Sequence, residues 1–164
     1  MMNKLWAPWR MDYIRRPKQD GCVFCLKSES IDDRNNLVLY KGKESFVLMN
    51  LYPYTNGHLL ISPYKHTADI NEISEFCNIE IMNLVNQSTN ILKKIKGADG
   101  FNFGANFGKA GGAGIEEHIH YHIVPRWVGD NNFMPVVGNT RVMVEGLQES
   151  WDKLKPEFDV ISEH

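Results

Sequence analysis

The segment HIHYHIV, residues 118–124, constrains this chain more than any other feature of its sequence. Alternate side chains of a β-strand project from opposite faces of the sheet. A strand here would place on one face the side chains of Ile119, Tyr121 and Ile123. The other face would carry the imidazoles of His118, His120 and His122. The pattern therefore predicts a sheet that packs on a core with one face and presents histidines to a ligand with the other.

Two kinds of chemistry are compatible with such a row of imidazoles. Histidines two residues apart on a strand can bind one transition metal through neutral ring nitrogens. Alternatively, one imidazole is a nucleophile, and its neighbours orient it and donate hydrogen bonds to a phosphate. Phosphoryl chemistry favours the second interpretation, because imidazole attacks phosphorus well and the phosphoramidate formed is labile. The residues alone leave both interpretations open.

The rest of the chain predicts an α+β domain. Two short apolar runs at 37–40 and 45–50 flank the sequence KGKE and indicate a β-hairpin, and HLLIS at 58–62 is typical of a further strand. Residues 101–107 alternate as a strand before the glycine-rich sequence GKAGGAG, and 118–125 form the last strand. This order favours a largely antiparallel sheet of about five strands, with one long helix on a face and a short C-terminal helix.

The long helix is expected over residues 73–96. Apolar side chains recur there with a period of about 3.6 residues, and Gly97 after three lysines is a typical helix end. The apolar stripe includes Phe76, Ile79 or Glu80, Asn83 or Leu84, Ile91 and Ile95, and it is broadened by Met82, Val85 and Leu92. Cys77 is expected in the core. The C-terminal helix would place on one side Leu147, Trp151 and Leu154.

Length and charge exclude several classes of protein. A chain of 164 residues fits one domain, with an N-terminal extension at 1–21 and a C-terminal extension at 128–164. The net charge of -2 provides no general attraction for nucleic acid or an anionic membrane. No stretch resembles a signal peptide or approaches the ~20 apolar residues of a membrane helix. We therefore expect a cytoplasmic protein that binds neither nucleic acid nor membrane.

Cys22 and Cys25 form a Cys-x-x-Cys motif with three possible meanings. A redox-active dithiol of the thioredoxin type should open a helix after a strand within a βαβ unit, and no such pattern surrounds these residues. The motif can also be half of a metal site or simply two buried thiols. No second Cys-x-x-Cys exists in the chain, so a zinc ion would need two ligands from elsewhere.

Several motifs together resemble the histidine-triad (HIT) family. They are HIHYHIV, the sequence NLYPYTNGHLLISPYKH at 50–66, the glycine-rich segment before the triad and PRW after it. The resemblance extends from Cys22 to Trp127. The opening LWAPWRMDYI and the later WVGDNNFMPV resemble the branch that contains bacterial diadenosine tetraphosphate phosphorylases. The resemblance implies the HIT-like α+β fold and a nucleotide substrate.

Carried over residue by residue, the resemblance implies a role for each candidate. His120 would be the nucleophile that attacks the α-phosphorus, and His122 would donate to the phosphate oxygens. His58 would line the same phosphate site, and Asn50 would bind the ribose hydroxyls. Family members often carry a polar residue in the glycine-rich segment. At that place this chain offers only small residues such as Gly114, with Asn106 upstream as a substitute.

The resemblance also implies a structural zinc and no organic cofactor. In zinc-bearing members of the family, a Cys-x-x-Cys, a histidine after the second substrate strand and the first triad histidine occur in this order. The corresponding ligands here are Cys22, Cys25, His66 and His118. Such a zinc would pin the N-terminal segment and fix His118 beside the nucleophile.

The expected function is that of a nucleotidyl transferase or hydrolase that cleaves a nucleoside phosphoanhydride, such as diadenosine tetraphosphate, through a nucleotidyl-histidine. The branch resemblance favours phosphate over water as the acceptor. The alternatives are a hydrolase of small adenylates such as nucleoside phosphoramidates, a metal-dependent hydrolase that uses the triad as ligands, and a non-catalytic nucleotide sensor. The resemblance further implies a homodimer, in which the long helix and an edge strand of each subunit build a continuous sheet.

Overall fold

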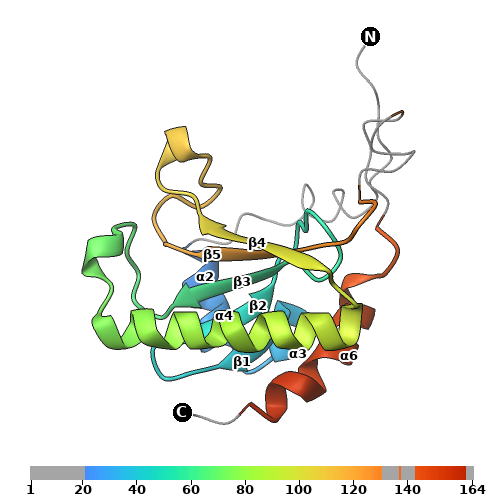
Figure 1. Cartoon of the computed structure of the whole chain (residues 1–164). Helices are drawn as coiled ribbons and strands as arrows, with labels where there is room; N and C mark the ends of the chain where they lie inside the picture. Colours follow the sequence, from blue (N-terminus) through green and yellow to red (C-terminus); the bar gives the residue numbers. More distant parts are fainter. Residues whose placement is uncertain (1–20, 131–136, 138–142, 162–164) are drawn as a thin grey trace.

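The computed structural model describes residues 21–130, 137 and 143–161 (Figure 1). Within these residues the chain forms a five-stranded sheet in the order β1-β2-β3-β5-β4, and every neighbouring pair is antiparallel. In chain order the helices and strands are α2 (Val23–Glu29), α3 (Asp33–Asn36), β1 (Val38–Lys41), β2 (Ser45–Met49), β3 (Leu59–Pro63), α4 (Glu75–Lys96), β4 (Gly100–Ala105), β5 (Tyr121–Arg126) and α6 (Leu147–Asp159). The α+β class, the strands and the long helix predicted from the sequence are confirmed.

The long helix α4 has clear signals at both ends. The hydroxyl of Ser74 accepts a hydrogen bond from the backbone N–H of Cys77 at the N-terminus. Gly97 ends the helix in the left-handed conformation, with a φ of 60°, which glycine adopts at little cost. The helix lies across one face of the sheet, as Figure 1 shows.

The buried stripe of α4 matches the predicted one only in part, at Leu84, Val85, Ile91 and Leu92. Phe76, Ile79 and Met82 are 80%, 52% and 49% exposed. The side chains that face the sheet are Cys77, Ile81, Leu84, Val85, Ser88, Ile91 and Leu92. At about 100° of rotation per residue, the three exposed side chains lie on the side of the helix opposite to this buried set. The helix therefore carries two apolar stripes, and the sheet covers only one of them.

Glu80 ties α4 to the hairpin between β1 and β2. Its carboxylate accepts hydrogen bonds from the backbone N–H groups of Lys43, Glu44 and Ser45 and from the Ser45 hydroxyl. A Cβ atom at Gly42 would collide with this carboxylate, so only glycine fits there. The hairpin donors are thus satisfied by the helix, which fixes the helix against the sheet.

Part of the C-terminal segment completes the core. Leu154 and Phe158 of α6 are fully buried against β1 and α4, and Leu147 and Trp151 lie on the same side of the helix, as expected. The expected N-terminal extension lies outside the described residues, apart from Gly21. In the described part of the chain, no helix is both long and apolar enough to cross a membrane.

The two faces of the sheet carry different contents. The face under α4 and α6 holds the main core, which includes Ile119 and Ile123. The opposite face holds a smaller apolar cluster under α2, formed by Phe24, Val38, Phe46, Leu48 and Leu60. The histidines lie on this second face, next to Phe24.

Candidate active site

The alternation predicted at residues 118–124 holds in the structure. Ile119 and Ile123 enter the main core, whereas His118 and His120 are buried on the other face and His122 is half-buried beside them. The paired strand is shorter than predicted, because β5 begins at Tyr121. Before it, the N–H of Ile119 donates to the carbonyl of Thr67 at 2.7 Å, and the residues before Tyr121 lie outside the ladder with β3.

The hydrogen bond of His120 determines which of its nitrogens can react. Nδ1 lies 2.9 Å from the backbone carbonyl oxygen of His118. A carbonyl oxygen only accepts, so Nδ1 carries the hydrogen, and Nε2 of the neutral ring keeps its lone pair. The main chain therefore leaves the Nε2 lone pair of His120 available for nucleophilic attack.

His58 and His122 form a directional pair. The backbone N–H of Tyr54 donates to Nδ1 of His58 at 3.1 Å, so Nε2 of His58 carries the hydrogen. This Nε2 lies 3.0 Å from Nδ1 of His122 and donates to it. Nε2 of His122 consequently carries a hydrogen, yet it is buried and has no hydrogen-bond partner among the residues that the structure describes. An unpartnered buried donor is costly, and a bound oxyanion would satisfy it.

Burial keeps these imidazoles neutral. It lowers the pKa of His58 to about 3 and that of His122 to about 4, with a further contribution from the neighbouring histidines. Burial also lowers the pKa of His120. Near neutral pH the site therefore combines an uncharged imidazole that has a free lone pair with an uncharged donor, and their ring centroids are 5.1 Å apart.

Asn50 lies at the turn that leads to His58. Its Oδ1 accepts from the N–H of Tyr52 at 2.8 Å, and its Nδ2 is 3.3 Å from Nδ1 of His58. The structure thus brings Asn50 next to the histidine pair, and the predicted ribose contact stays a prediction.

Asn106 and Gly114 lie in the loop between β4 and β5. Nδ2 of Asn106 is 3.5 Å from the carbonyl of Gly112, and Gly114 is exposed. Neither forms a hydrogen bond with a histidine side chain in the part of the chain that the structure describes, so their predicted contacts with substrate stay predictions.

The four predicted metal ligands form one cluster. The ligand atoms of Cys22, Cys25, His66 and His118 all lie within 4.8 Å of one another. Nδ1 of His118 is 3.2 Å from Sγ of Cys22 and 3.2 Å from Nδ1 of His66. On its other side, Nε2 of His118 donates to the carbonyl of Pro63 at 2.9 Å, so the Nδ1 lone pair faces the cluster. Two thiols and two imidazoles in this arrangement fit a tetrahedral zinc ion.

Two contributors to the site were not predicted from the sequence. The Tyr54 amide sets the tautomer of His58, and Phe24 packs on His118 and His120, with ring centroids at 5.2 and 4.7 Å. The position of Phe24 between Cys22 and Cys25 could have indicated that it lies near the metal ligands. A backbone amide leaves no signal in a sequence.

Comparison with known proteins gives consistent matches. The family model described as "HIT domain" matches residues 32–128. AP-4-A phosphorylase of Mycobacterium tuberculosis strain H37Rv is 31% identical over 165 residues, covering 96% of this chain and 85% of that protein.

Solved structures share the fold. A zinc-bound histidine triad family protein from Mycobacterium smegmatis superposes with a TM-score of 0.68 at 24% identity, covering 85% of this chain and 94% of that one. The Plasmodium falciparum diadenosine triphosphate hydrolase superposes with a TM-score of 0.62 at 25% identity, covering 79% of each chain. The matched model spans more than half of the chain, and this protein therefore belongs to the HIT domain family.

Proposed function

We propose that this protein is a nucleotidyl transferase or hydrolase that cleaves a dinucleoside polyphosphate, with diadenosine tetraphosphate as the favoured substrate, through a nucleotidyl group on His120. The observation that carries the proposal is the pairing of a free Nε2 lone pair on His120 with the buried, unpartnered Nε2–H of His122. A phosphate group placed between them would meet a nucleophile and a hydrogen-bond donor at once.

The reaction proceeds in two displacements. Nε2 of His120 attacks the α-phosphorus in line, a P–N bond forms, and the P–O bond to the remaining phosphates breaks, so the leaving group departs with the electron pair. The His120 ring becomes positively charged, and the His118 carbonyl that accepts from Nδ1 stabilises this charge. An oxygen of phosphate or water then attacks the same phosphorus: a new P–O bond forms, the P–N bond breaks, and its electron pair returns to Nε2, which restores the neutral ring.

His122 stabilises charge on the phosphate during both steps. Its Nε2–H donates to an oxygen that gains negative charge in the transition state. His58 holds His122 in this tautomer by donating to its Nδ1. The chain of donors begins at the backbone of Tyr54, so the protein itself fixes the direction of the final N–H.

Relatives support the substrate class. The match to AP-4-A phosphorylase covers 96% of this chain. This similarity favours adenine dinucleotides as substrates and phosphate as the acceptor. The metal-dependent hydrolase alternative is less consistent with the geometry, because Nδ1 of His118 faces the cysteines and Nδ1 of His120 donates to a carbonyl. In the described residues, the three triad histidines do not group as ligands of one ion.

Product analysis tests the proposal. The protein is incubated with diadenosine tetraphosphate, with and without inorganic phosphate, and the nucleotides are separated by chromatography. Phosphate-dependent release of ATP and ADP would identify a phosphorylase, and ATP plus AMP without phosphate would identify a hydrolase. No product in either reaction would contradict this substrate and leave small adenylates or nucleotide sensing as the alternatives.

The His120→Ala variant tests the nucleophile. We expect its turnover to fall by at least about a thousandfold, because no other described side chain offers a free imidazole lone pair at that point. Metal content and thermal stability should match the wild type. Normal turnover of His120→Ala would exclude the covalent route.

We further propose that Cys22, Cys25, His66 and His118 hold a structural zinc ion. The donor set and the tautomer of His118 support this assignment, as does the zinc-bound relative from M. smegmatis. When bound, the ion would cross-link α2 to the segment that carries the nucleophile.

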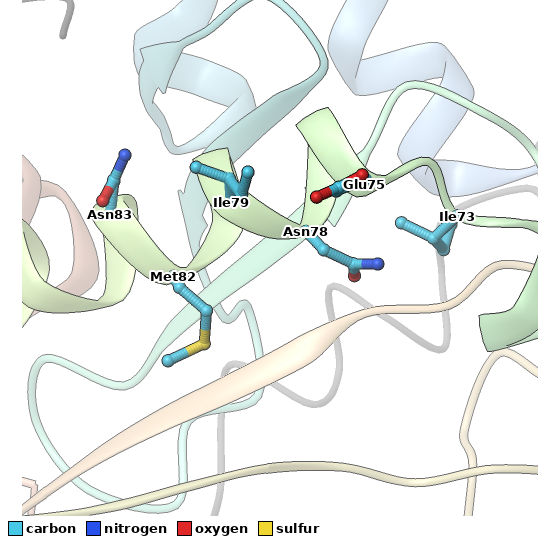
Figure 2. Close-up of a pocket in the computed structure, with 6 residues that line it drawn as sticks. All are labelled: Ile73, Glu75, Asn78, Ile79, Met82 and Asn83. Carbon is cyan, nitrogen blue, oxygen red and sulfur yellow. The ribbon is translucent and has the colours of Figure 1, made fainter.

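We also propose that the protein forms the homodimer that its sequence resemblance implies. The uncovered stripe of α4 borders an open depression of about 550 Å³ (Figure 2), lined by Ile73, Glu75, Asn78, Ile79, Met82 and Asn83. At the edge of the sheet, β4 exposes Phe103 to 43%. Apolar surface and an open sheet edge are features that association would cover.

A further inference from the structure

Phe24 connects the metal cluster to the nucleophile. It lies on α2 between Cys22 and Cys25 and is 2% exposed. Its ring packs on His118, a proposed metal ligand, and more closely on His120. One side chain therefore contacts both centres from the same short helix.

The hydrogen bonding of His120 leaves one degree of freedom for Phe24 to restrict. The bond from Nδ1 to the His118 carbonyl fixes one edge of the imidazole but not the plane of the ring. The torsion that turns an imidazole about its Cβ–Cγ bond has a broad minimum, so packing must set this plane. The ring of Phe24 at 4.7 Å and the ring of His122 at 5.1 Å are the described aromatic neighbours of His120.

The position of Phe24 depends in turn on α2. This helix has seven residues, and no side chain caps its N-terminus. Isolated helices of this length are marginal in water, so tertiary contacts must hold it in place. The buried Phe24 and the two cysteines are such contacts, since Cys22 and Cys25 reach His118 and His66.

We infer that Phe24 is a positioning residue for the reaction: its ring fixes the plane of the His120 imidazole so that the Nε2 lone pair points at the phosphorus. The inference rests on the proposed function for its kinetic consequence, but the orientation of His120 can be measured without any substrate. In-line attack tolerates little misalignment, and a displacement of about 1 Å can cost about a hundredfold in rate.

Phe46 provides a matched control. It belongs to the same apolar cluster, is fully buried and stacks on Tyr64 with a centroid distance of 5.5 Å. None of its described ring contacts involves a histidine. Phe24→Leu and Phe46→Leu thus remove the same ring from one cluster, but only the first removes it from His120.

The test compares both variants with the metal-loaded wild type. For Phe24→Leu we expect unchanged zinc content, a KM within about twofold and a kcat lowered by about tenfold or more. The ring signals of His120 in the NMR spectrum should broaden, because the imidazole then samples more than one plane about its Cβ–Cγ bond, while the His118 carbonyl still holds the Nδ1–H tautomer. Phe46→Leu should keep the wild-type kcat and the wild-type His120 signals.

The outcomes separate this inference from the proposed function. Wild-type kcat and His120 signals in Phe24→Leu would overturn the inference, as would equal losses in both variants, which would indicate a general packing effect. If the wild type is inactive on the substrate, the proposed function fails, and the His120 signals of the two variants still decide the role of Phe24.

Discussion

Individual histidines in this protein acquire different properties from the main-chain groups that face them. His120 donates to a carbonyl, and His58 accepts from an amide. An imidazole consequently keeps a free Nε2 lone pair at His120 and carries an Nε2–H donor at His58. Both residues must be neutral for this. A protonated ring has no lone pair with which His120 could attack or His58 could accept from the Tyr54 amide.

This neutrality makes stability depend on pH. The pKa of His58 falls from 6.5 to about 3 on folding, because burial disfavours its charged form. Between these values the unfolded chain binds a proton that the folded protein does not, so the free energy of unfolding falls as the pH is lowered from about 6.5. The loss expected from His58 alone is on the order of 2 kcal/mol at about pH 5.

Urea unfolding at about pH 7, 6 and 5 measures this loss, and His58→Gln serves as the comparison. The variant should lose less stability on acidification than the wild type, and the difference in slope isolates His58 from other groups, such as metal ligands. Glu145 contributes little in this range, because hydrogen bonds from lysines and a serine lower its pKa from 4.5 to about 2, and both values lie below pH 5. Equal slopes in the two proteins would show that His58 is not held neutral.

At the residue scale, the sequence predicts which side chains form the site but not the tautomer of each imidazole. Alternation was enough to place His118, His120 and His122 on one face, because a strand has only two sides. The tautomers depend on the carbonyl of Pro63 and the amide of Tyr54, whose positions follow from the strand register and a turn. No side-chain pattern encodes those positions.

At the scale of secondary structure, α4 shows why periodicity was only partly informative. The period located the helix correctly, but a helix with apolar residues on two sides does not reveal which side meets the sheet. The short helices α2 and α3, of seven and four residues, were not predicted because neither spans enough turns to show a period.

The uncovered stripe of α4 leads to a prediction about assembly. We expect the wild type to sediment as a dimer and Ile79→Lys to sediment as a monomer, because a lysine in the centre of the stripe would carry an unpaired charge into the interface. Val160→Lys is the control, since Val160 is also an exposed apolar residue, 75% accessible, but lies at the end of α6. Sedimentation of the wild type as a monomer would contradict the proposed dimer.

At the scale of the whole molecule, the main hydrophobic core and the histidines lie on opposite faces of the sheet. The main core lies on one face, where α4 and α6 cover it, and the histidines lie on the other, under the short helix α2. The second face has less apolar surface to hold its helix in place. A metal cross-link between α2 and residues 66 and 118 would supply the missing constraint, since metal binding adds directly to the free energy of folding.

Cys22→Ser tests this division. Loss of one thiolate should lower the zinc content well below one ion per chain and reduce the melting temperature by on the order of 5–10 °C. Cys77→Ser is the matched control, because Cys77 is a buried thiol on α4 that faces the main core. It should lose stability but keep its zinc. An unchanged zinc content in Cys22→Ser would exclude the proposed ligand set, whereas zinc loss without a change in melting temperature would show that α2 is held by its apolar contacts alone.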